Sequence, residues 1–323
     1  MRSFLLKVNI LMSTYNGEKY VGQQIESIQK QSFTEWNLLV RDDGSKDKTC
    51  DIVASYAQLD PRIQLIQAEN KGVIESFYEL AKYNQADYYF FCDQDDYWLP
   101  EKLQTILDEA VKHDNKKAKL YYTDLKIVDK NLHIINESMI RSQSGHANTK
   151  LVQELTENSV TGCTMMANNA LIRLWKDTSD IIMHDWYLAL LAASQEGLIY
   201  IDHPTILYRQ HEDNVLGART LNKRIKKWLR PYLWFKKYWW LIIESQNQAK
   251  KLLVDDIQIS EENRDLIQNY ISILEQNQST RCAWIKKHNL RKNKSGHTRI
   301  FRALIITKFA YKAFLRSDRK DIK

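Results

Sequence analysis

Short apolar runs and longer amphipathic stretches alternate along the first hundred residues, a pattern typical of strands followed by helices. The apolar runs predict buried strands at Lys7–Met12, Asn37–Val40, Ile63–Ile66 and Tyr88–Cys92. The amphipathic stretches predict helices at Glu18–Gln31, Asp47–Tyr56 and Val73–Tyr83. Strands and helices that alternate through short connections form a parallel sheet with helices on both faces. The pattern therefore predicts an α/β fold.

A polar turn follows each of the four predicted strands. These turns are Ser13–Gly17, Asp42–Ser45, Asn70–Gly72 and Asp93–Asp96. Because ligands of open α/β sheets bind outside the carboxyl ends of the strands, we expect the four turns to surround one site. The chain has no GxGxxG and no GxxxxGK[ST] motif, which argues against a dinucleotide-binding fingerprint and a P-loop.

The fourth turn is strongly acidic, because Asp93, Asp95 and Asp96 directly follow the apolar run Tyr88–Cys92. Carboxylates crowded into four residues repel one another unless a cation neutralises them. Mg²⁺ takes oxygen ligands and often joins a carboxylate to substrate phosphates. The turn therefore predicts a metal and a nucleotide diphosphate at the end of this strand. The alternative is an acidic turn that binds nothing.

The pattern is less regular after residue 100. It predicts, in chain order, helix Glu101–His113, strand Lys119–Asp124, a hairpin over Ile127–Ile135, a loop over Glu137–Thr149, a strand over Asn158–Met166, helices Asn169–Asp177 and Trp186–Ser194, and an edge strand at Leu198–Ile201. The loop is polar and has no periodicity, so we expect it to be mobile and to order over a bound donor.

Length and cysteine usage limit the class of protein. At 323 residues the chain can hold one large domain with an appendage, or two domains. Its four cysteines are widely spaced and include no CxxC pair, which argues against a disulfide framework or zinc site and suits a reducing cytosol. The N-terminal stretch lacks the long apolar core of a signal peptide, and no run of 18 apolar residues predicts a membrane-spanning helix.

Charge is distributed unevenly along the chain. Residues 1–213 contain 22 Lys and Arg against 31 Asp and Glu, whereas residues 214–323 contain 25 against 9. Segment Asn222–Trp240 mixes cations with aromatic residues and is predicted to form two helices separated at Pro231. Arg299–Leu315 predicts another basic amphipathic helix. We expect this region to contact an anionic membrane surface rather than nucleic acid, and a helical core or oligomer interface is the other alternative.

Four segments in the first 103 residues resemble a known family. They are STYNGEKYV at Ser13–Val21, RDDGSKDKT at Arg41–Thr49, ENKGV at Glu69–Val73 and FFCDQDDYWLPEKL at Phe90–Leu103. In this order they resemble the family 2 glycosyltransferases of the GT-A fold. The resemblance implies a mostly parallel α/β sheet flanked by helices, here followed by a helical, basic and aromatic C-terminal extension.

The resemblance also implies which residues bind the nucleotide-sugar donor. This set is Thr14, Tyr15, Asn16, Asp42, Asn70, Gly72, Asp93 and Asp96. Asp42 would hydrogen-bond a pyrimidine base, whereas Asp43 would hold its turn in place. Asp93 would contact the ribose or the sugar, and Asp96 would bind the sugar or cap the next helix. Asp95 would ligate Mg²⁺ or Mn²⁺.

A second group of residues belongs to the acceptor side. His184-Asp185-Trp186 resembles the family's [EH]-D-W segment, whose Asp is the base in inverting members. The resemblance makes Asp185 the base, with His184 positioning it and Trp186 stacking on an acceptor sugar; helix capping by Asp185 is the alternative. The segment around Gly162 resembles the acceptor-side strand, where small residues let a sugar approach the backbone.

TILYRQHEDNVLG at Thr205–Gly217 resembles the YRQHxxNxxG segment of bacterial rhamnosyltransferases within this family. His211 would be a further metal ligand, since neutral imidazole is a common one, although a lone histidine is more often a core or surface residue. Arg209 would contact the diphosphate, for which the guanidinium geometry is suited, and Tyr208 would contact the acceptor.

Together these expectations describe a metal-dependent inverting glycosyltransferase. Residues 1–217 would form the catalytic domain, with a nucleotide-sugar half at 1–100 and an acceptor half at 101–217, and residues 218–323 a helical region. The donor would be dTDP-β-L-rhamnose and the acceptor a lipid-linked glycan of cell-wall or capsular polysaccharide synthesis. The enzyme would be cytoplasmic and peripheral at the membrane's inner face, with homo-oligomerisation left open. A UDP-hexose donor, a nucleotidyltransferase and a membrane-associated scaffold are the alternatives.

Overall fold

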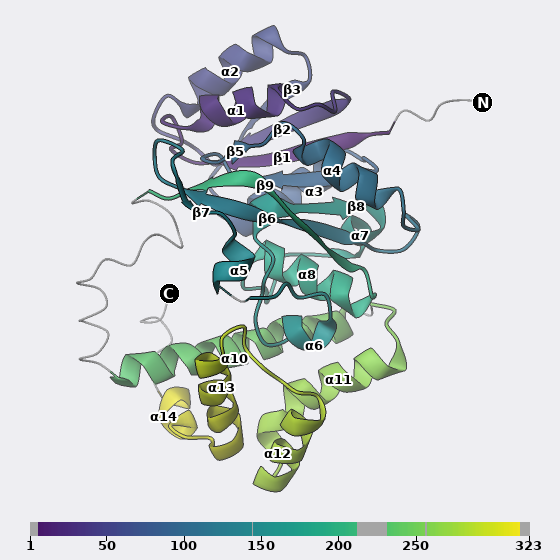
Figure 1. Ribbon diagram of the computed structural model, residues 1–323, viewed down its shortest axis with the longest axis vertical. Helices are drawn as coiled ribbons and strands as arrows, with labels where there is room; N and C mark the ends of the chain where they lie inside the picture. The colour runs from purple at the N-terminus through teal and green to yellow at the C-terminus, as the bar shows by residue number, and fades with distance from the viewer. Residues whose placement is uncertain (1–5, 144, 212–230, 256, 317–323) are drawn as a thin grey trace.

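The structure is a computed structural model that describes residues 6–143, 145–211, 231–255 and 257–316. The described residues contain one nine-stranded sheet in the order β3-β2-β1-β4-β8-β6-β9-β5, with β7 paired to β6 (Figure 1). Helices cover both faces of this sheet (Figure 1). The C-terminal helices form a further group on the side of α8 that faces away from the sheet (Figure 1). The segment 212–230, which includes much of the predicted basic aromatic stretch, lies outside the described residues.

The first four strands of the sheet are parallel. They are β1 (Val8–Thr14), β2 (Trp36–Asp42), β3 (Ile63–Gln67) and β4 (Tyr88–Cys92). The register places Thr14 opposite Asp42, and Met12 opposite Cys92. The polar turns after β1, β2 and β4 therefore leave the sheet at the same edge, as the sequence predicts.

The second half of the sheet is mixed. It contains β8 (Met165–Asn168), β6 (Leu120–Val128), β9 (Leu198–Arg209), the short β5 (Tyr97–Trp98) and β7 (Ile134–Asn136). β8 is antiparallel to both β4 and β6, whereas β6 and β9 are parallel. β9 also pairs with β5, and this pairing brings residues 206–207 next to residues 97–98, directly after the acidic turn.

Two apolar clusters lie on the two faces of the sheet, because successive strand residues point to opposite faces. On β1, Ile10 belongs to a cluster with α1 (Val21–Gln29), α2 (Thr49–Leu59) and α4 (Lys102–Ala110). The next residue, Leu11, belongs to the other cluster with α3 (Val73–Tyr83), α7 (Asn169–Leu174) and α8 (His184–Ser194). α8, which carries the predicted base, is thus packed against the second face.

The C-terminal region is helical. Its elements are α10 (Pro231–Val254), α11 (Glu261–Ser272), η2 (Ile273–Glu275), α12 (Gln278–Lys287), α13 (Ser295–Thr307) and α14 (Tyr311–Leu315). Tyr238 and Trp239 are buried in the same apolar cluster as α8. Among the described residues, no helix combines the length and apolar character needed to cross a membrane. Because Tyr238 and Trp239 are buried, they are core residues, as the helical-core alternative predicts, and they do not face lipid.

Pro231 is the first residue of α10, a position that tolerates its missing N–H. The helix predicted before Pro231 lies outside the described residues, so a break between two helices there stays a prediction. The helix predicted over Arg299–Leu315 is divided into α13 and α14 by Lys308 and Ala310, whose φ angles are 54° and 59°. A helix cannot continue through left-handed residues.

Three further predictions are wrong in detail. The polar loop Glu137–Thr149 contains a short helix, α5 (Met139–Gln143), because Asp124 accepts a hydrogen bond from the amide of Ile140 at 3.1 Å. The segment Asn158–Met166 is mostly not a strand: the 3₁₀ turn η1 (Gly162–Thr164) precedes β8. The strand predicted at Leu198–Ile201 is the beginning of β9, which continues to Arg209. Residues 198–201 pair with β6 alone, as expected of an edge, and residues 206–207 also pair with β5. A further short helix, α6 (Leu151–Glu154), lies between α5 and η1.

Candidate active site

Asp42 ends β2 and is enclosed by its own turn. Its carboxylate accepts hydrogen bonds from Thr14 Oγ1 at 2.8 Å, Ser45 Oγ at 2.6 Å, and the amides of Gly44 at 3.1 Å and Ser45 at 2.8 Å. Burial would raise the pKa of Asp42, but the bonds from Ser45 and Thr14 outweigh it and lower the pKa. Four bonds match the lone-pair sites of a carboxylate. The geometry does not suit the predicted bond to a pyrimidine base; Asp42 instead joins the ends of β1 and β2.

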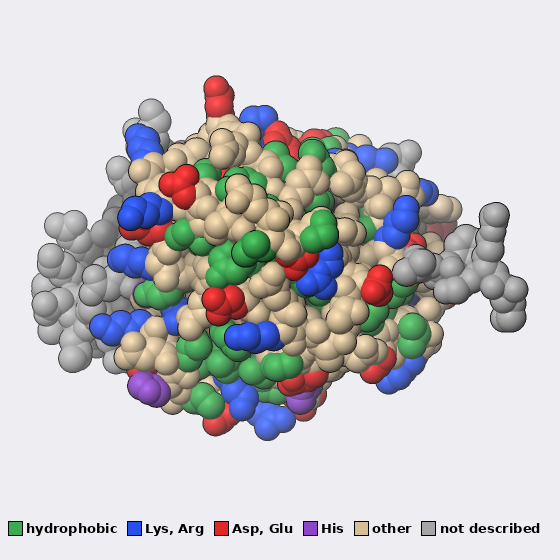
Figure 2. Space-filling view, turned by 90° about the horizontal axis from the view of Figure 1, so that it is seen from above, with side chains coloured by type: hydrophobic (Ala, Val, Ile, Leu, Met, Phe, Trp, Pro, Cys, Tyr) green, Lys and Arg blue, Asp and Glu red, His purple; other side chains and the backbone are tan. Residues whose placement is uncertain are grey.

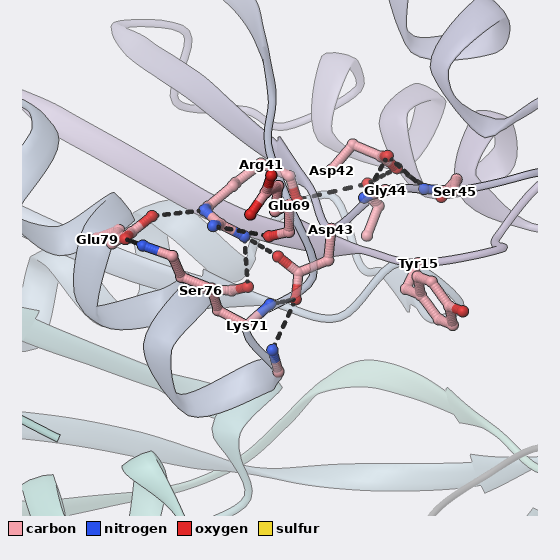
Figure 3. Close-up of polar contacts among 12 residues, drawn as sticks. Tyr15, Arg41, Asp42, Asp43, Gly44, Ser45, Glu69, Lys71, Ser76 and Glu79 are labelled. Carbon is pink, nitrogen blue, oxygen red and sulfur yellow. Dashed lines mark hydrogen bonds and ion pairs between the residues drawn. The ribbon is translucent and has the colours of Figure 1, made fainter. Parts of the chain in front are cut away.

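Asp43 and Arg41 connect this turn to the start of α3 (Figure 3). Buried Arg41 forms an ion pair with Asp43, and its Nε bonds Glu79 at 2.8 Å. Asp43 also accepts hydrogen bonds from the amides of Lys71 at 3.3 Å and Gly72 at 3.0 Å. The network fixes the turn Asn70–Gly72 beside the turn after β2, so Asp43 holds the turn in place as predicted.

Gln94 connects the acidic turn to the turn after β1. Its Oε1 accepts a hydrogen bond from the Tyr15 amide at 2.9 Å, and its Nε2 donates to the Tyr15 carbonyl at 3.1 Å. A Cβ at Gly17 would lie 2.2 Å from Gln94 Oε1, so the glycine makes room for this side chain. The neighbouring Asn16 receives Lys46 N–H at 2.9 Å. The Tyr15 ring is 47% exposed at this edge, where a flat ligand can reach it.

The predicted metal ligands Asp95 and His211 are in direct contact. Nε2 of His211 lies 2.8 Å from Oδ2 of Asp95, and the side chains are 13% and 22% exposed, respectively. Neighbouring ligands of an octahedral ion with bonds of about 2.1 Å are separated by about 3 Å, so these two atoms can share one divalent ion. The His211 ring also packs on Tyr20 with 5.1 Å between centroids, which fixes its orientation.

Arg209 lies beneath this pair rather than facing a ligand. It is 1% exposed, and its guanidinium donates to the carbonyl of Asp95 at 2.8 Å, the carbonyl of Lys130 at 2.6 Å and Gln23 Oε1 at 2.5 Å. Its amide donates to Asp96 Oδ1 at 3.2 Å. The predicted contact between Arg209 and a diphosphate does not fit this burial, and the side chain instead holds the backbone of the acidic turn.

Asp93, Asp96 and Cys163 form a second acidic group, with one candidate ligand atom from each within 4.8 Å of the others. Burial, and then the charges of Asp95 and Asp185, raise the pKa of Asp93 to about 7. Burial, and then the charges of Asp95 and Asp93, also raise the pKa of Asp96. Asp93 is therefore about half protonated at pH 7, and the protonated form of Asp96 is favoured.

The fully buried Lys102 already supplies one positive charge beside this group. Its Nζ donates to the Cys163 carbonyl at 3.0 Å, and its charge is close enough to act on Asp96 and Asp93. Burial lowers the pKa of Lys102 to about 8, so the side chain is still mostly charged at pH 7. A built-in ammonium makes the Asp93, Asp96 and Cys163 group less suited to a metal than the Asp95 and His211 pair.

Asp185 lies in the first turn of α8 and is not its N-cap, which is Met183. The capping alternative is therefore wrong for this helix, which begins two residues earlier than predicted. Burial raises the pKa of Asp185 to about 7, against hydrogen bonds from the amides of Trp186 and Gly162 that lower it. A carboxyl with this pKa is a stronger base than an exposed aspartate and is about half ionised at pH 7.

His184 and Gly162 pack closely beside Asp185. The His184 ring stacks on Phe77 and Phe91 with centroids 4.3 Å and 5.6 Å apart, and burial lowers its pKa to about 3, so it is neutral. A Cβ at Gly162 would lie 3.0 Å from His184 Nε2 and 3.8 Å from Asp185 Cβ. The absence of a side chain at Gly162 is what lets the 3₁₀ turn approach the start of α8.

Trp186 is 7% exposed, and its Nε1 donates to the carbonyl of Glu154 in α6 at 2.7 Å. This placement does not suit the predicted stacking on an acceptor sugar; the indole joins α6 to α8. Tyr208 is half-buried beside the acidic group: burial, and then the charges of Cys163, Asp96 and Asp93, raise its pKa.

The structure brings the acidic turn and the predicted base into one electrostatic site, because the charges of Asp95 and Asp185 both act on Asp93. Sequence reasoning missed three side chains that lie at this candidate site, namely Gln94, Lys102 and Glu154, whose carboxyl is close enough to Asp185 for the two charges to interact. Lys102 had a usable signal, since helical spacing places it four residues before Ile106 on the buried face of α4. Glu154 and Gln94 carried no periodic signal, because tertiary contacts alone bring them to the site.

Comparisons with known proteins identify the family of this chain. A family model described as glycosyl transferase family 2 matches residues 9–175. The chain is 30% identical over 226 residues to "dTDP-rhamnosyl transferase RfbG" of Shigella flexneri, which covers 64% of this chain and 74% of that protein.

Two solved structures share the fold. S. aureus TarS residues 1–349 in complex with UDP-GlcNAc aligns with a TM-score of 0.56 and 19% identity, over 87% of this chain and 79% of that one. The mannosyltransferase PcManGT from Pyrobaculum calidifontis, in complex with GDP-Man and Mn²⁺, aligns with a TM-score of 0.51 and 14% identity, over 99% and 84%. At these identities the alignments show the fold alone, and that fold is the predicted one. The chain therefore belongs to glycosyltransferase family 2 and has the GT-A fold.

Proposed function

We propose that this glycosyltransferase inverts the configuration of the transferred sugar, with Asp185 as the base. The observation that carries the proposal is the placement of Asp185: it is buried at the start of α8, has a pKa raised to about 7, and acts electrostatically on Asp93 of the acidic turn. A base near neutral pKa beside a donor site is what deprotonation of an acceptor hydroxyl requires. Neutral His184 packs beside it and carries no competing charge.

In the reaction, the acceptor oxygen attacks the anomeric carbon on the face opposite the leaving nucleotide, while Asp185 takes the hydroxyl proton. The bond between the anomeric carbon and the phosphate oxygen breaks, and a nucleoside diphosphate leaves. Tyr15 and Asn16, at the edge held by Gln94, would contact the nucleotide, and Asn70 and Gly72 would face it from the neighbouring turn. Asp93 would contact the ribose or sugar.

Mg²⁺ or Mn²⁺ would be held by Asp95 and His211, whose ligand atoms are 2.8 Å apart. When bound, the ion would supply positive charge to the departing diphosphate. Arg209 supports this site from below, since it holds the Asp95 carbonyl at 2.8 Å and the Asp96 carboxylate through its amide. The mixed carboxylate and imidazole pair fits a divalent ion better than the group that already contains Lys102.

The donor that we propose is dTDP-β-L-rhamnose, which inversion would convert to an α-linkage. The similarity to a protein named as a dTDP-rhamnosyl transferase supports this donor. A UDP-hexose is the second candidate, because a structure of the same fold is in complex with UDP-GlcNAc. We further propose a lipid-linked glycan acceptor in cell-wall or capsular polysaccharide synthesis.

The test is a donor panel with wild-type protein and the Asp185→Asn variant. The protein is incubated with dTDP-rhamnose, UDP-glucose or UDP-GlcNAc and Mn²⁺, and release of nucleoside diphosphate is measured. We expect the fastest release with dTDP-rhamnose and a loss of at least a hundredfold in Asp185→Asn. Release of pyrophosphate would indicate a nucleotidyltransferase, and full activity of Asp185→Asn would refute the assigned base.

We also propose that residues 218–323 form a helical region that contacts an anionic membrane surface, with α14 as the contact. No acidic residue occurs between Gln276 and Arg316. Phe309 and Leu315 are 60% and 53% exposed and lie among exposed cations such as Lys312. In contrast, acidic and basic side chains are interspersed on the face at the opposite, α2 end of the molecule (Figure 2).

A flotation assay tests the membrane contact, in which the protein is mixed with vesicles containing phosphatidylglycerol. We expect the wild type to float, and the double variant Phe309→Ser and Leu315→Ser to float several times less, because it loses apolar insertion and keeps its charge. Equal flotation of the two proteins would refute a role for α14. Equal flotation of the wild type with neutral and with anionic vesicles would refute the electrostatic attraction to the membrane.

A further inference from the structure

The segment Asp177–Tyr187 leads into α8 and carries the proposed base near its end. Within it, Asp180 adopts a left-handed conformation with a φ of 56°. Non-glycine residues rarely adopt this conformation and keep it where the surrounding structure holds them. Asp180 therefore marks an irregular turn shortly before α8.

One helix of the C-terminal region, α10, supplies contacts on both sides of Asp185. Before the base, the Ile182 amide donates to Gln248 Oε1 at 2.9 Å, and Lys251 Nζ donates to Asp177 Oδ1 at 2.7 Å. After the base, Tyr187 Oη donates at 3.0 Å to Oδ2 of Asp255, the residue that directly follows α10. Three directional bonds thus connect α10 and its next residue to the segment that contains Asp185.

Lys251 joins these contacts into one network. Its side chain is 5% exposed, and its Nζ lies within hydrogen-bond distance of the half-exposed Asp177 and of Asp255, the latter at 3.2 Å. Burial raises the pKa of Asp177, but the bond from Lys251 outweighs it and lowers the pKa to about 2. The pairing of Lys251 with Asp177 therefore stays ionised throughout the pH range in which the enzyme would work.

Directional bonds add to apolar packing at the start of α8. Residues Trp186 to Ser194 are buried, so packing resists displacement of the helix, but hydrophobic contacts have no preferred direction. Hydrogen bonds are directional, so they define the position of the first turn. The geometry of Asp185 is sensitive to such shifts, because misplacing a reacting group by about 1 Å can cost a hundredfold in rate.

We propose that Lys251 and Gln248 are positioning residues of the reaction, through which the C-terminal helical region sets the place of Asp185. This inference rests on the proposed role of Asp185 as the base. The C-terminal helical region would then contribute to catalysis through α10, separately from the membrane contact proposed for α14.

The experiment compares Lys251→Met with Lys250→Met, which removes the neighbouring exposed lysine of the same helix. Lys251→Arg keeps the charge, and Gln248→Leu removes the acceptor for Ile182. We measure kcat and donor KM with the donor that the panel selects, and the affinity for dTDP and UDP with Mn²⁺ by calorimetry. We also measure hydrogen–deuterium exchange of peptides that cover residues 178–190. All proteins are full-length and are used without vesicles.

We expect kcat to fall roughly tenfold to a hundredfold in Lys251→Met and Gln248→Leu, with donor KM and nucleotide affinity within about twofold of wild type. Amide exchange at residues 178–187 should rise in both variants but not in Lys250→Met, and Lys251→Arg should recover part of the rate. A merely structural role would lower nucleotide affinity together with kcat, and that outcome overturns the proposal.

Unchanged exchange at residues 178–187 in Lys251→Met also overturns the proposal, whatever the activity. The exchange measurement needs no substrate, so it separates this inference from the proposed function. If Asp185→Asn is fully active while exchange rises in Lys251→Met, the base is wrong and the structural connection between α10 and α8 stands. If Asp185→Asn is inactive and exchange is unchanged, the base stands and the positioning role is wrong.

Discussion

The turnover of this enzyme should depend on pH through Asp185. Burial raises the pKa of this carboxyl from an ordinary value of 3.8 to about 7. Only the ionised form can accept the proton of the acceptor hydroxyl. With that pKa, about one tenth of the carboxyl is ionised at pH 6 and about nine tenths at pH 8, so kcat should rise roughly tenfold between them.

Two neighbouring groups have to be separated from this effect. Asp93 also has a pKa of about 7, raised by burial and by the charges of Asp95 and Asp185, but it belongs to the proposed donor site, so its ionisation should change donor affinity. Measuring kcat at saturating donor and Mn²⁺ removes that contribution. His184 does not interfere, because burial lowers its pKa to about 3 and it stays neutral between pH 5 and 8.5.

The assay is release of nucleoside diphosphate at saturating donor and acceptor, from pH 5 to 8.5. Wild-type protein is compared with Asp185→Asn and with Asp202→Asn, which changes an exposed aspartate on β9. We expect kcat of the wild type and of Asp202→Asn to fall toward low pH, with a midpoint near pH 7. The kcat of Asp185→Asn should be low and should not fall further at low pH. A wild-type kcat that is constant from pH 5.5 to 8 would refute the reasoning.

Three further predictions follow from buried contacts. Gly162→Ala should lower kcat about tenfold in the same assay, because its Cβ would lie 3.0 Å from the packed His184 ring; unchanged kcat would contradict this. In urea unfolding, Asp43→Ala should cost about 3 kcal/mol, since it leaves a buried guanidinium without one partner, whereas Asp202→Ala removes an exposed ion pair and should cost less than about 1 kcal/mol. The pKa of buried Glu154 is raised to about 8, mainly by burial, so its contribution to stability is present below about pH 4.5 and is lost as the pH rises to about 8. Glu154→Gln should therefore unfold at a higher temperature than the wild type at pH 8 and not at pH 5, and an equal difference at both pH values would argue against it.

The sequence by itself determined the first half of the fold and the location of the site. The bounds predicted for α3 and β4 are those of the structure, Val73–Tyr83 and Tyr88–Cys92. These elements follow from local hydrophobic periodicity, because residues close in sequence decide which face of a helix or strand is buried. The edge of the sheet at which the polar turns meet also follows from the alternation, since parallel strands end on one side.

Tertiary structure decided what the side chains at that edge do. The side chains of Asp42 and Arg209 form hydrogen bonds within the protein rather than facing a ligand, and Lys102 is buried beside the acidic group. Their partners are distant in sequence, so only the folded chain brings them together. The same holds for the C-terminal region: Trp239 suits a lipid surface and a protein core equally by composition, since both exclude water, and only packing against α8 places it in the core. Composition determines that a side chain must leave water, whereas the assembled fold decides what covers it.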